Sequence, residues 1–151
     1  MDRFKKIISW MLVAGWMGLI FYLSHQTGEG SGSLSGSITE RIIAFLRLDN
    51  VDIDFLHFLV RKGAHLFAYF VLGILLVNAF RMSGMVAGKY YYLSLAICVI
   101  YGMTDELHQL LVPGRSGQVR DVLIDSVGAL IGISAYKIFL KLVGFTEEKK
   151  A

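Results

Sequence analysis

The chain has one cysteine and one proline among its 151 residues, and only 18% of its residues are charged. The single thiol, Cys98, has no second thiol with which to form an intramolecular disulfide or a metal-binding pair. The single proline, Pro113, leaves the long apolar runs without a helix-breaking residue. The net charge of +3 comes without an arginine-rich face interleaved with aromatics, which argues against a nucleic-acid partner.

Hydrophobic residues, in contrast, make up 55% of the chain, and the mean hydropathy is +0.58. A bilayer core of about 30 Å is crossed by roughly 20 apolar helical residues. Four runs fit this length, at about residues 7–24, 64–82, 90–109 and 122–141. The sequence therefore predicts an all-α fold, an integral membrane bundle of four transmembrane helices formed by residues 1–151 as one domain.

The first run also follows basic residues, as a secretory signal peptide does. Its apolar stretch is longer than a typical signal-peptide core, and no A-x-A cleavage pattern follows it. We therefore expect this run to be retained as a membrane span.

The distribution of lysine and arginine predicts the orientation of the bundle. With the N-terminus in the cytoplasm, nine basic residues fall on the inner side and six on the outer side. The inner set is Arg3, Lys5, Lys6, Arg81, Lys89, Lys137, Lys141, Lys149 and Lys150, and the outer set is Arg41, Arg47, Arg61, Lys62, Arg115 and Arg120. Because cytoplasmic loops carry the excess of basic residues, both termini are predicted to be cytoplasmic.

Residues 25–63 form a long outer segment between the first two spans. Residues 28–37, GEGSGSLSGS, are rich in Gly and Ser and predict a flexible turn. Residues 38–46 place apolar side chains at helical spacing, which predicts a short amphipathic helix on the outer membrane surface. Asp54 is expected to cap the helix that leads into the second span.

Ionisable residues fall at one depth in three of the spans. A helix that starts at Tyr90 carries Asp105 to about 22 Å along its axis, which is inside the hydrocarbon slab. His65 and Asp125 fall just inside the outer ends of the second and fourth spans. Ionisable groups in a membrane are costly, so they are expected to face the bundle interior or an aqueous cleft.

The spacing of the polar residues supports this expectation. Within each of three predicted helices, the polar residues are spaced so that they share one face. The first set is His57, Arg61, His65 and Tyr69, and the second is Asp105, His108 and Gln109. The third is Asp121 and Asp125, on the same face as Gly128 and Gly132. The small residues of GALIG allow two helices to approach closely. Pro113 and Gly114 are expected to turn the chain so that Arg115 folds back over the polar cluster.

Five motifs carry a family resemblance: Phe21-Tyr-Leu-Ser-His-Gln26, Arg61-Lys62-x-x-His65-x-x-x-Tyr69, Asp105-Glu106-x-His108-Gln109, Pro113-Gly114-Arg115 and Asp121-x-x-x-Asp125-x-x-Gly128. In these motifs the sequence resembles the VanZ-like family of bacterial membrane proteins. The resemblance covers about residues 7–136. It implies a location in the bacterial cell membrane and a link to lowered susceptibility to teicoplanin, a lipoglycopeptide.

The polar residues predict a site, which has two interpretations. In the functional one, the catalytic candidates are His65, Asp105, Glu106 and His108, and the ligand-binding candidates are Arg61, Lys62, Tyr69, Gln109, Arg115, Asp121 and Asp125. A histidine beside a carboxylate can exchange protons near neutral pH, and arginine binds phosphate at two points. In the structural interpretation, the acids only clamp helices together through nearby basic residues. Asp105, His108 and His65 would also suit a divalent metal, but no familiar zinc spacing supports that alternative.

Three functions remain open. The favoured one is recognition, with or without modification, of a phosphorylated lipid or lipid-linked cell-wall precursor at the outer leaflet. The second is a non-catalytic membrane protein that limits lipoglycopeptide access or assists a cell-wall enzyme. The third is a proton-coupled transporter. With only four spans in each chain, such a transporter would need to form a homodimer. No nucleophile stands out, so enzyme activity is left open, and the sequence indicates no cofactor.

Overall fold

The computed structural model describes residues 3–47, 52–86 and 88–144, and in these ranges every regular element is a helix. The five helices are α1 (Arg3–Ser24), α2 (Gly28–Leu46), α3 (Ile53–Met82), α4 (Lys89–Gln109) and α5 (Val119–Leu142). The all-α class is therefore confirmed.

Three of the helices, α1, α3 and α5, are long and apolar enough to cross a membrane. The bounds of α4 agree with the predicted run at residues 90–109, but its composition places it outside this set. Its tyrosines and its polar end, TDELHQ, make it less apolar than the others. Length and composition thus support three spans.

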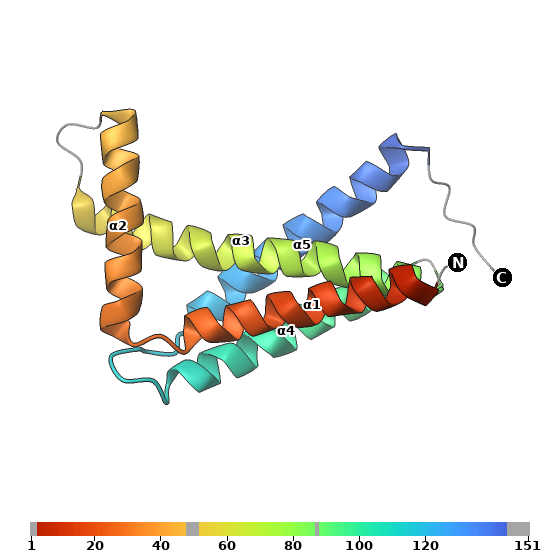
Figure 1. Cartoon of the computed structure of the whole chain (residues 1–151), viewed down its shortest axis with the longest axis horizontal. Helices are drawn as coiled ribbons and strands as arrows, with labels where there is room; N and C mark the ends of the chain where they lie inside the picture. The colour runs from red at the N-terminus through yellow and green to blue at the C-terminus, as the bar shows by residue number, and fades with distance from the viewer. Residues whose placement is uncertain (1–2, 48–51, 87, 145–151) are drawn as a thin grey trace.

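The helices α1, α3 and α4 run alongside one another, α5 crosses α3, and α2 lies across one end of the group (Figure 1). α3 is central, because it packs against each of the other four helices. Its residues Tyr69, Leu72 and Leu76 are almost completely buried. They form the core with Cys98 of α4 and Ala129 of α5.

Two glycines of α5 allow its close contact with α3. A Cβ atom at Gly128 would lie 2.2 Å from the carbonyl oxygen of Leu66, and one at Gly132 would lie 2.1 Å from that of Phe70. Side chains at these positions would collide with backbone, so the predicted close approach of GALIG is present between α5 and α3.

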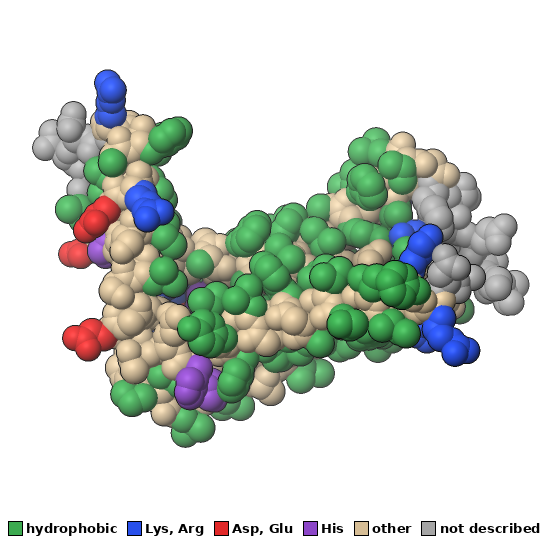
Figure 2. All heavy atoms as spheres, viewed as in Figure 1, with side chains coloured by type: hydrophobic (Ala, Val, Ile, Leu, Met, Phe, Trp, Pro, Cys, Tyr) green, Lys and Arg blue, Asp and Glu red, His purple; other side chains and the backbone are tan. Residues whose placement is uncertain are grey.

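The outside of the helix group is covered by hydrophobic side chains (Figure 2). Large residues on α1, α4 and α5 remain more than half exposed, such as Met11, Tyr92, Leu130, Ile138 and Phe139. Water solvates such a surface poorly, whereas lipid tails solvate it well. The exterior is that of a membrane protein.

The prediction of a flexible turn at residues 28–37 is wrong, because this stretch forms the first half of α2. The Thr27 side chain caps the helix by accepting a hydrogen bond from the Gly30 N–H at 3.2 Å. Farther along, Ser35, Ser37 and Thr39 donate their hydroxyls to backbone carbonyls four residues earlier, over 2.8–3.1 Å. Thr39 is completely buried, and α2 packs on α3. The Thr27 cap and the packing of α2 on α3 offset the roughly 1 kcal/mol that each glycine costs within a helix.

Asp54 was the wrong choice of helix cap. The cap is Asp52, whose side chain accepts a hydrogen bond from the Phe55 N–H at 3.1 Å, and Asp54 lies in the first turn. The predicted span at residues 64–82 is therefore the second part of a single 30-residue helix. Of the basic residues used for the orientation, Lys149 and Lys150 lie outside the described residues.

Candidate functional site

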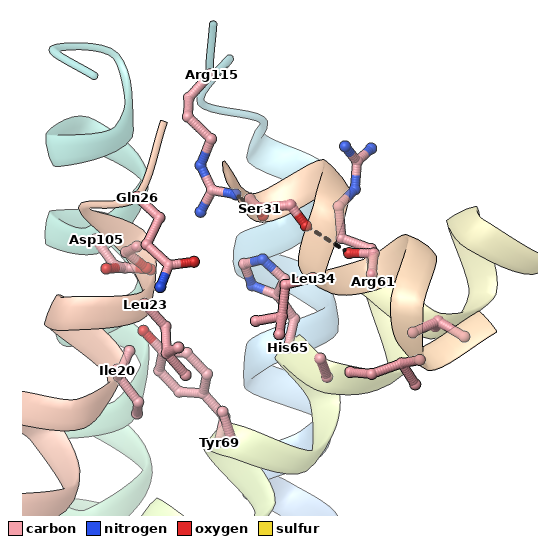
Figure 3. Close-up of a pocket in the computed structure, with 16 residues that line it drawn as sticks. Ile20, Leu23, Gln26, Ser31, Leu34, Arg61, His65, Tyr69, Asp105 and Arg115 are labelled. Carbon is pink, nitrogen blue, oxygen red and sulfur yellow. Dashed lines mark hydrogen bonds between the residues drawn. The ribbon is translucent and has the colours of Figure 1, made fainter. Parts of the chain in front are cut away.

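A cavity of about 130 Å³ lies where α2 crosses the ends of α1 and α3 (Figure 3). One side of it is apolar, and its walls there are formed by Ile20 and Leu23 of α1, Leu34 and Ile38 of α2, and Val60, Ala64 and Ala68 of α3. The polar side holds His65, Asp105 and Arg115. Residues from five segments of the chain therefore meet at one place.

A second cavity, of about 70 Å³, adjoins the first and is lined mainly by polar residues. The two cavities share four residues, Ser31, Arg61, His65 and Arg115. The second one continues toward Gln109, Gln118 and Asp121. Together they form a site with an apolar compartment and a polar compartment on either side of the shared residues.

Arg115 reaches the site because of a tight turn after α4. Gly114 adopts a left-handed conformation with φ of 73°, which favours glycine. The backbone there also lies against the start of α2, since the Gly28 N–H donates to the Pro113 carbonyl at 3.1 Å. A Cβ atom at Gly28 would lie only 2.0 Å from the Gly114 oxygen. The predicted turn at Pro113 and Gly114 is confirmed, and it holds the first turn of α2 in place.

The guanidinium of Arg115 faces α2 and donates a hydrogen bond to the Ser31 hydroxyl at 2.7 Å. Partial burial lowers the pKa of Arg115 from its ordinary value, while the nearby carboxylate of Asp105 opposes this effect. Arginine nevertheless keeps its charge in proteins, so the site retains a cation at neutral pH. Its Nε atom is buried without a hydrogen-bond partner in the described part of the chain.

Asp105 is 4% exposed and is well satisfied by hydrogen bonds. Its Oδ2 atom accepts from the Ser24 hydroxyl at 2.8 Å and from the Gln109 side-chain amide at 3.1 Å. Ser24 was not among the predicted site residues, although it belongs to the motif FYLSHQ. This carboxylate is therefore fixed by α1 and its own helix, with one edge toward the cavity.

His65, Glu106 and Asp125 form a second polar group, with one residue from each of α3, α4 and α5. His65 Nδ1 lies 3.3 Å from Asp125 Oδ1. Glu106 Oε2 accepts a hydrogen bond from the Gln118 N–H at 2.7 Å. One potential metal-ligating atom from each of the three residues lies within 4.8 Å of the others. An imidazole backed by a carboxylate can exchange a proton near neutral pH, and the group has the atoms to hold a cation.

The remaining candidates divide between the cavity and other contacts. Tyr69 lines the first cavity, and its hydroxyl has no partner within the described ranges. Lys62 and Asp121 are buried and form an ion pair with each other, with the Lys62 ammonium 5.5 Å from the centre of the Phe58 ring. These two residues therefore clamp α3 to α5.

His108 lies apart from the cavity. Its Nε2 atom is 3.1 Å from Nδ1 of His25, and its ring packs on Phe21 with a centroid distance of 4.7 Å. Asp105 and Gln109 share the face that points to the cavity, whereas His108 points toward the end of α1. No sequence pattern indicated that the two histidines meet, because they are separated by 83 positions in the chain.

Residues 9–140 match the model of the VanZ/LLP1 family. The chain belongs to the VanZ/LLP1 family. All five motifs on which the resemblance rested lie within the matched residues. Membership and the apolar helices support a VanZ-like membrane protein with a link to antibiotic resistance. No curated protein and no solved structure matches the chain significantly.

Proposed function

We propose that the protein binds a phosphorylated lipid, such as a phospholipid or a lipid-linked cell-wall precursor, at the outer leaflet of the bacterial cell membrane. The pair of adjoining cavities is the observation that carries this function. An amphiphile needs an apolar compartment for its tail and a polar one for its headgroup, and here the two share Ser31, Arg61, His65 and Arg115.

The polar compartment suits an anion. Arg115 and Arg61 line both cavities and bring two guanidinium groups to one site. A guanidinium binds phosphate oxygens through two parallel N–H donors, which is stronger and more specific than a single contact. The Nε of Arg115 has no hydrogen-bond acceptor among the described residues, so this guanidinium has an unused donor. The headgroup would thus replace or join Ser31 as the acceptor of Arg115.

The apolar compartment suits a hydrocarbon chain. It lies in the angle between α2 and the other helices, where hydrophobic side chains line both sides (Figure 2). Leu34 and Ile38 of α2 are nearly half exposed there. A cavity of this size is far smaller than the 300–1,000 Å³ typical of drug-sized ligands, so it fits a headgroup and the first part of a tail rather than a whole lipoglycopeptide.

We further propose that α4 crosses the membrane with α1, α3 and α5, and that α2 lies on the outer surface. α4 packs against each of the other three helices and has a comparable length, which supports a fourth span. α2 lies at the end of the group opposite the start of α1 and the end of α5 (Figure 1). The termini would then be cytoplasmic, in agreement with the excess of basic residues on that side.

This topology predicts the labelling of single cysteines in intact cells. In a Cys98→Ala background, Glu40→Cys on α2 is expected to react with a membrane-impermeant maleimide added outside. Val86→Cys, in the connection between α3 and α4, is expected to react only after the cells are opened. Both side chains are exposed, so burial within the protein does not prevent the maleimide from reaching either cysteine. The opposite labelling pattern would contradict the orientation.

The binding proposal predicts that Arg115→Gln lowers the amount of bound phosphorylated lipid by about tenfold or more, because a charge-assisted hydrogen bond contributes about 1.5–3 kcal/mol. The protein is extracted from native membranes in polymer discs, exchanged into detergent, and its retained lipids are counted by mass spectrometry. Arg120→Gln is the matched control, since Arg120 is an exposed arginine at the same end of the molecule. Equal retention by the two variants would argue against the proposed headgroup site.

A further inference from the structure

Three buried side chains that commonly bind metals converge behind the wall of the cavity. His65 comes from α3, Glu106 from α4 and Asp125 from α5, and one ligand-type atom of each lies within 4.8 Å of the others. Glu106 is 5% exposed and Asp125 is completely buried. His65 faces the cavity (Figure 3), so the group is next to the space that a headgroup would fill.

Two of the carboxylate oxygens in this group have no hydrogen-bond partner among the described residues. They are Glu106 Oε1 and Asp125 Oδ2, and the Tyr69 hydroxyl nearby is unpartnered as well. Buried polar atoms almost always have a partner, and leaving a carboxylate oxygen without one is costly. Unpartnered oxygens on two buried acids of one group therefore indicate a ligand bound by that group.

Two basic residues of the site have other partners. Lys62 is paired with Asp121, and Arg115 donates to Ser31 on the α2 side of the cavity. Glu106 and Asp125 are thus left facing one imidazole and one backbone N–H. A divalent cation would balance the two negative charges of these buried groups, because uncompensated buried charge is costly.

The donor set also suits a metal ion. One imidazole nitrogen and two carboxylate oxygens form a common ligand combination for Zn²⁺ and related divalent transition metals. Three protein ligands leave coordination positions open, as at metal sites that also bind water or a substrate.

We propose that His65, Glu106 and Asp125 together bind one divalent transition-metal ion at the inner wall of the cavity. The sequence pattern suggests Asp105 and His108 as metal ligands with His65, whereas the structure gives Asp105 other partners and places His108 beside His25. The proposal that the ion binds depends only on His65, Glu106 and Asp125 and not on the proposed lipid function. Any contact between the ion and a phosphate rests, in addition, on the proposed function.

The test uses the full chain in discs of a zwitterionic lipid, with any affinity tag removed and metals stripped by a chelator. The protein is then equilibrated with Zn²⁺ or Mn²⁺, and bound metal is measured by mass spectrometry. The expected result is about one ion per chain. Glu106→Gln and Asp125→Asn are each expected to weaken binding by about tenfold or more, since each removes a charged ligand.

Asp105→Asn is the matched control, because Asp105 is as buried as Glu106, is adjacent to it in sequence, and is satisfied by Ser24 and Gln109. It is expected to bind close to one ion with near wild-type affinity. A measurement on the wild-type protein alone guards against misfolded variants: bound Mn²⁺ should show the ¹⁴N coupling of a single imidazole in pulsed electron paramagnetic resonance.

Absence of stoichiometric binding by the wild type would overturn the proposal. So would binding that Glu106→Gln and Asp125→Asn leave unchanged, or bound Mn²⁺ without nitrogen coupling. This experiment measures the metal alone and does not test retention of a lipid at Arg115, so its failure would leave the lipid-binding proposal standing. Failure of the Arg115→Gln experiment would likewise leave the metal site standing.

Discussion

Replacing Gly128 by alanine is expected to destabilise the protein by about 3 kcal/mol, at the upper end of the cost of overpacking a core. The new Cβ atom would lie 2.2 Å from the carbonyl oxygen of Leu66, and backbone cannot move aside as a side chain can. α3 and α5 would have to separate, which would also pull apart the residues they bring to the cavity. The free energy of unfolding in mixed detergent, from a denaturing-detergent titration, measures the effect.

Gly63→Ala is the control for this experiment. Gly63 lies in α3, and a Cβ atom there would meet no other atom within 4 Å. Its substitution is expected to leave the protein as stable or to stabilise it by up to about 1 kcal/mol, the advantage of alanine over glycine within a helix. If Gly128→Ala proved as stable as Gly63→Ala, the close contact between α3 and α5 would be wrong.

The second large effect is expected at the ion pair that links α3 and α5. Lys62→Met leaves the carboxylate of Asp121 buried without its partner, and breaking a buried pair in this way costs about 3–5 kcal/mol. Removing both charges, in Lys62→Met with Asp121→Leu, is expected to restore much of this loss, because no uncompensated charge remains. The same detergent titration measures both variants.

Lys141→Met serves as the control for loss of a lysine, since Lys141 is exposed near the end of α5. This substitution is expected to leave the free energy of unfolding nearly unchanged. A double variant that is no more stable than Lys62→Met alone would show that the two residues do not act as a pair. The clamp interpretation of these two ligand-binding candidates would then fail.

Helical periodicity predicted that polar residues of three helices come together, and in the structure they lie near one end of the helix group. The prediction that His108 shares a face with Asp105 and Gln109 is wrong, because His108 lies against His25 and Phe21. His65, Asp105 and Asp125 lie near one end of the helix group, as expected from their distances along the apolar runs that contain them. Counting residues along a helix fixes height, since each residue adds 1.5 Å. Fold class and the location of the site could therefore be predicted from sequence.

The partners of each residue could not be predicted in this way. Whether Asp125 faces His65, and whether His108 faces the cavity or His25, depends on how each helix is rotated about its axis. That rotation is set by side-chain packing between helices, including the contacts of Gly128 and Gly132, and no single helix contains this information. The sequence therefore predicted the members of the site better than their pairings.

The wrong prediction of a flexible turn in the first half of α2 has a different reason. Gly and Ser predict flexibility because they form helices weakly in water. In this chain the Thr27 cap and the burial of Thr39 against the other helices outweigh that preference. Ser31, which Arg115 contacts, was missed as a site residue because it belongs to this stretch.

The most direct test of the account is to find where a phosphorylated lipid touches the protein. Phosphatidic acid with a photoreactive diazirine in its acyl chain is incorporated into phosphatidylcholine discs with the protein, irradiated, and the adducts are mapped by peptide mass spectrometry. We expect adducts on Leu23, Leu34 and Ile38 that excess unlabelled phosphatidic acid removes and excess diacylglycerol, which has no phosphate, does not. Adducts confined to outward-facing residues such as Leu130 and Phe139, and insensitive to both competitors, would contradict a lipid site between α1, α2 and α3.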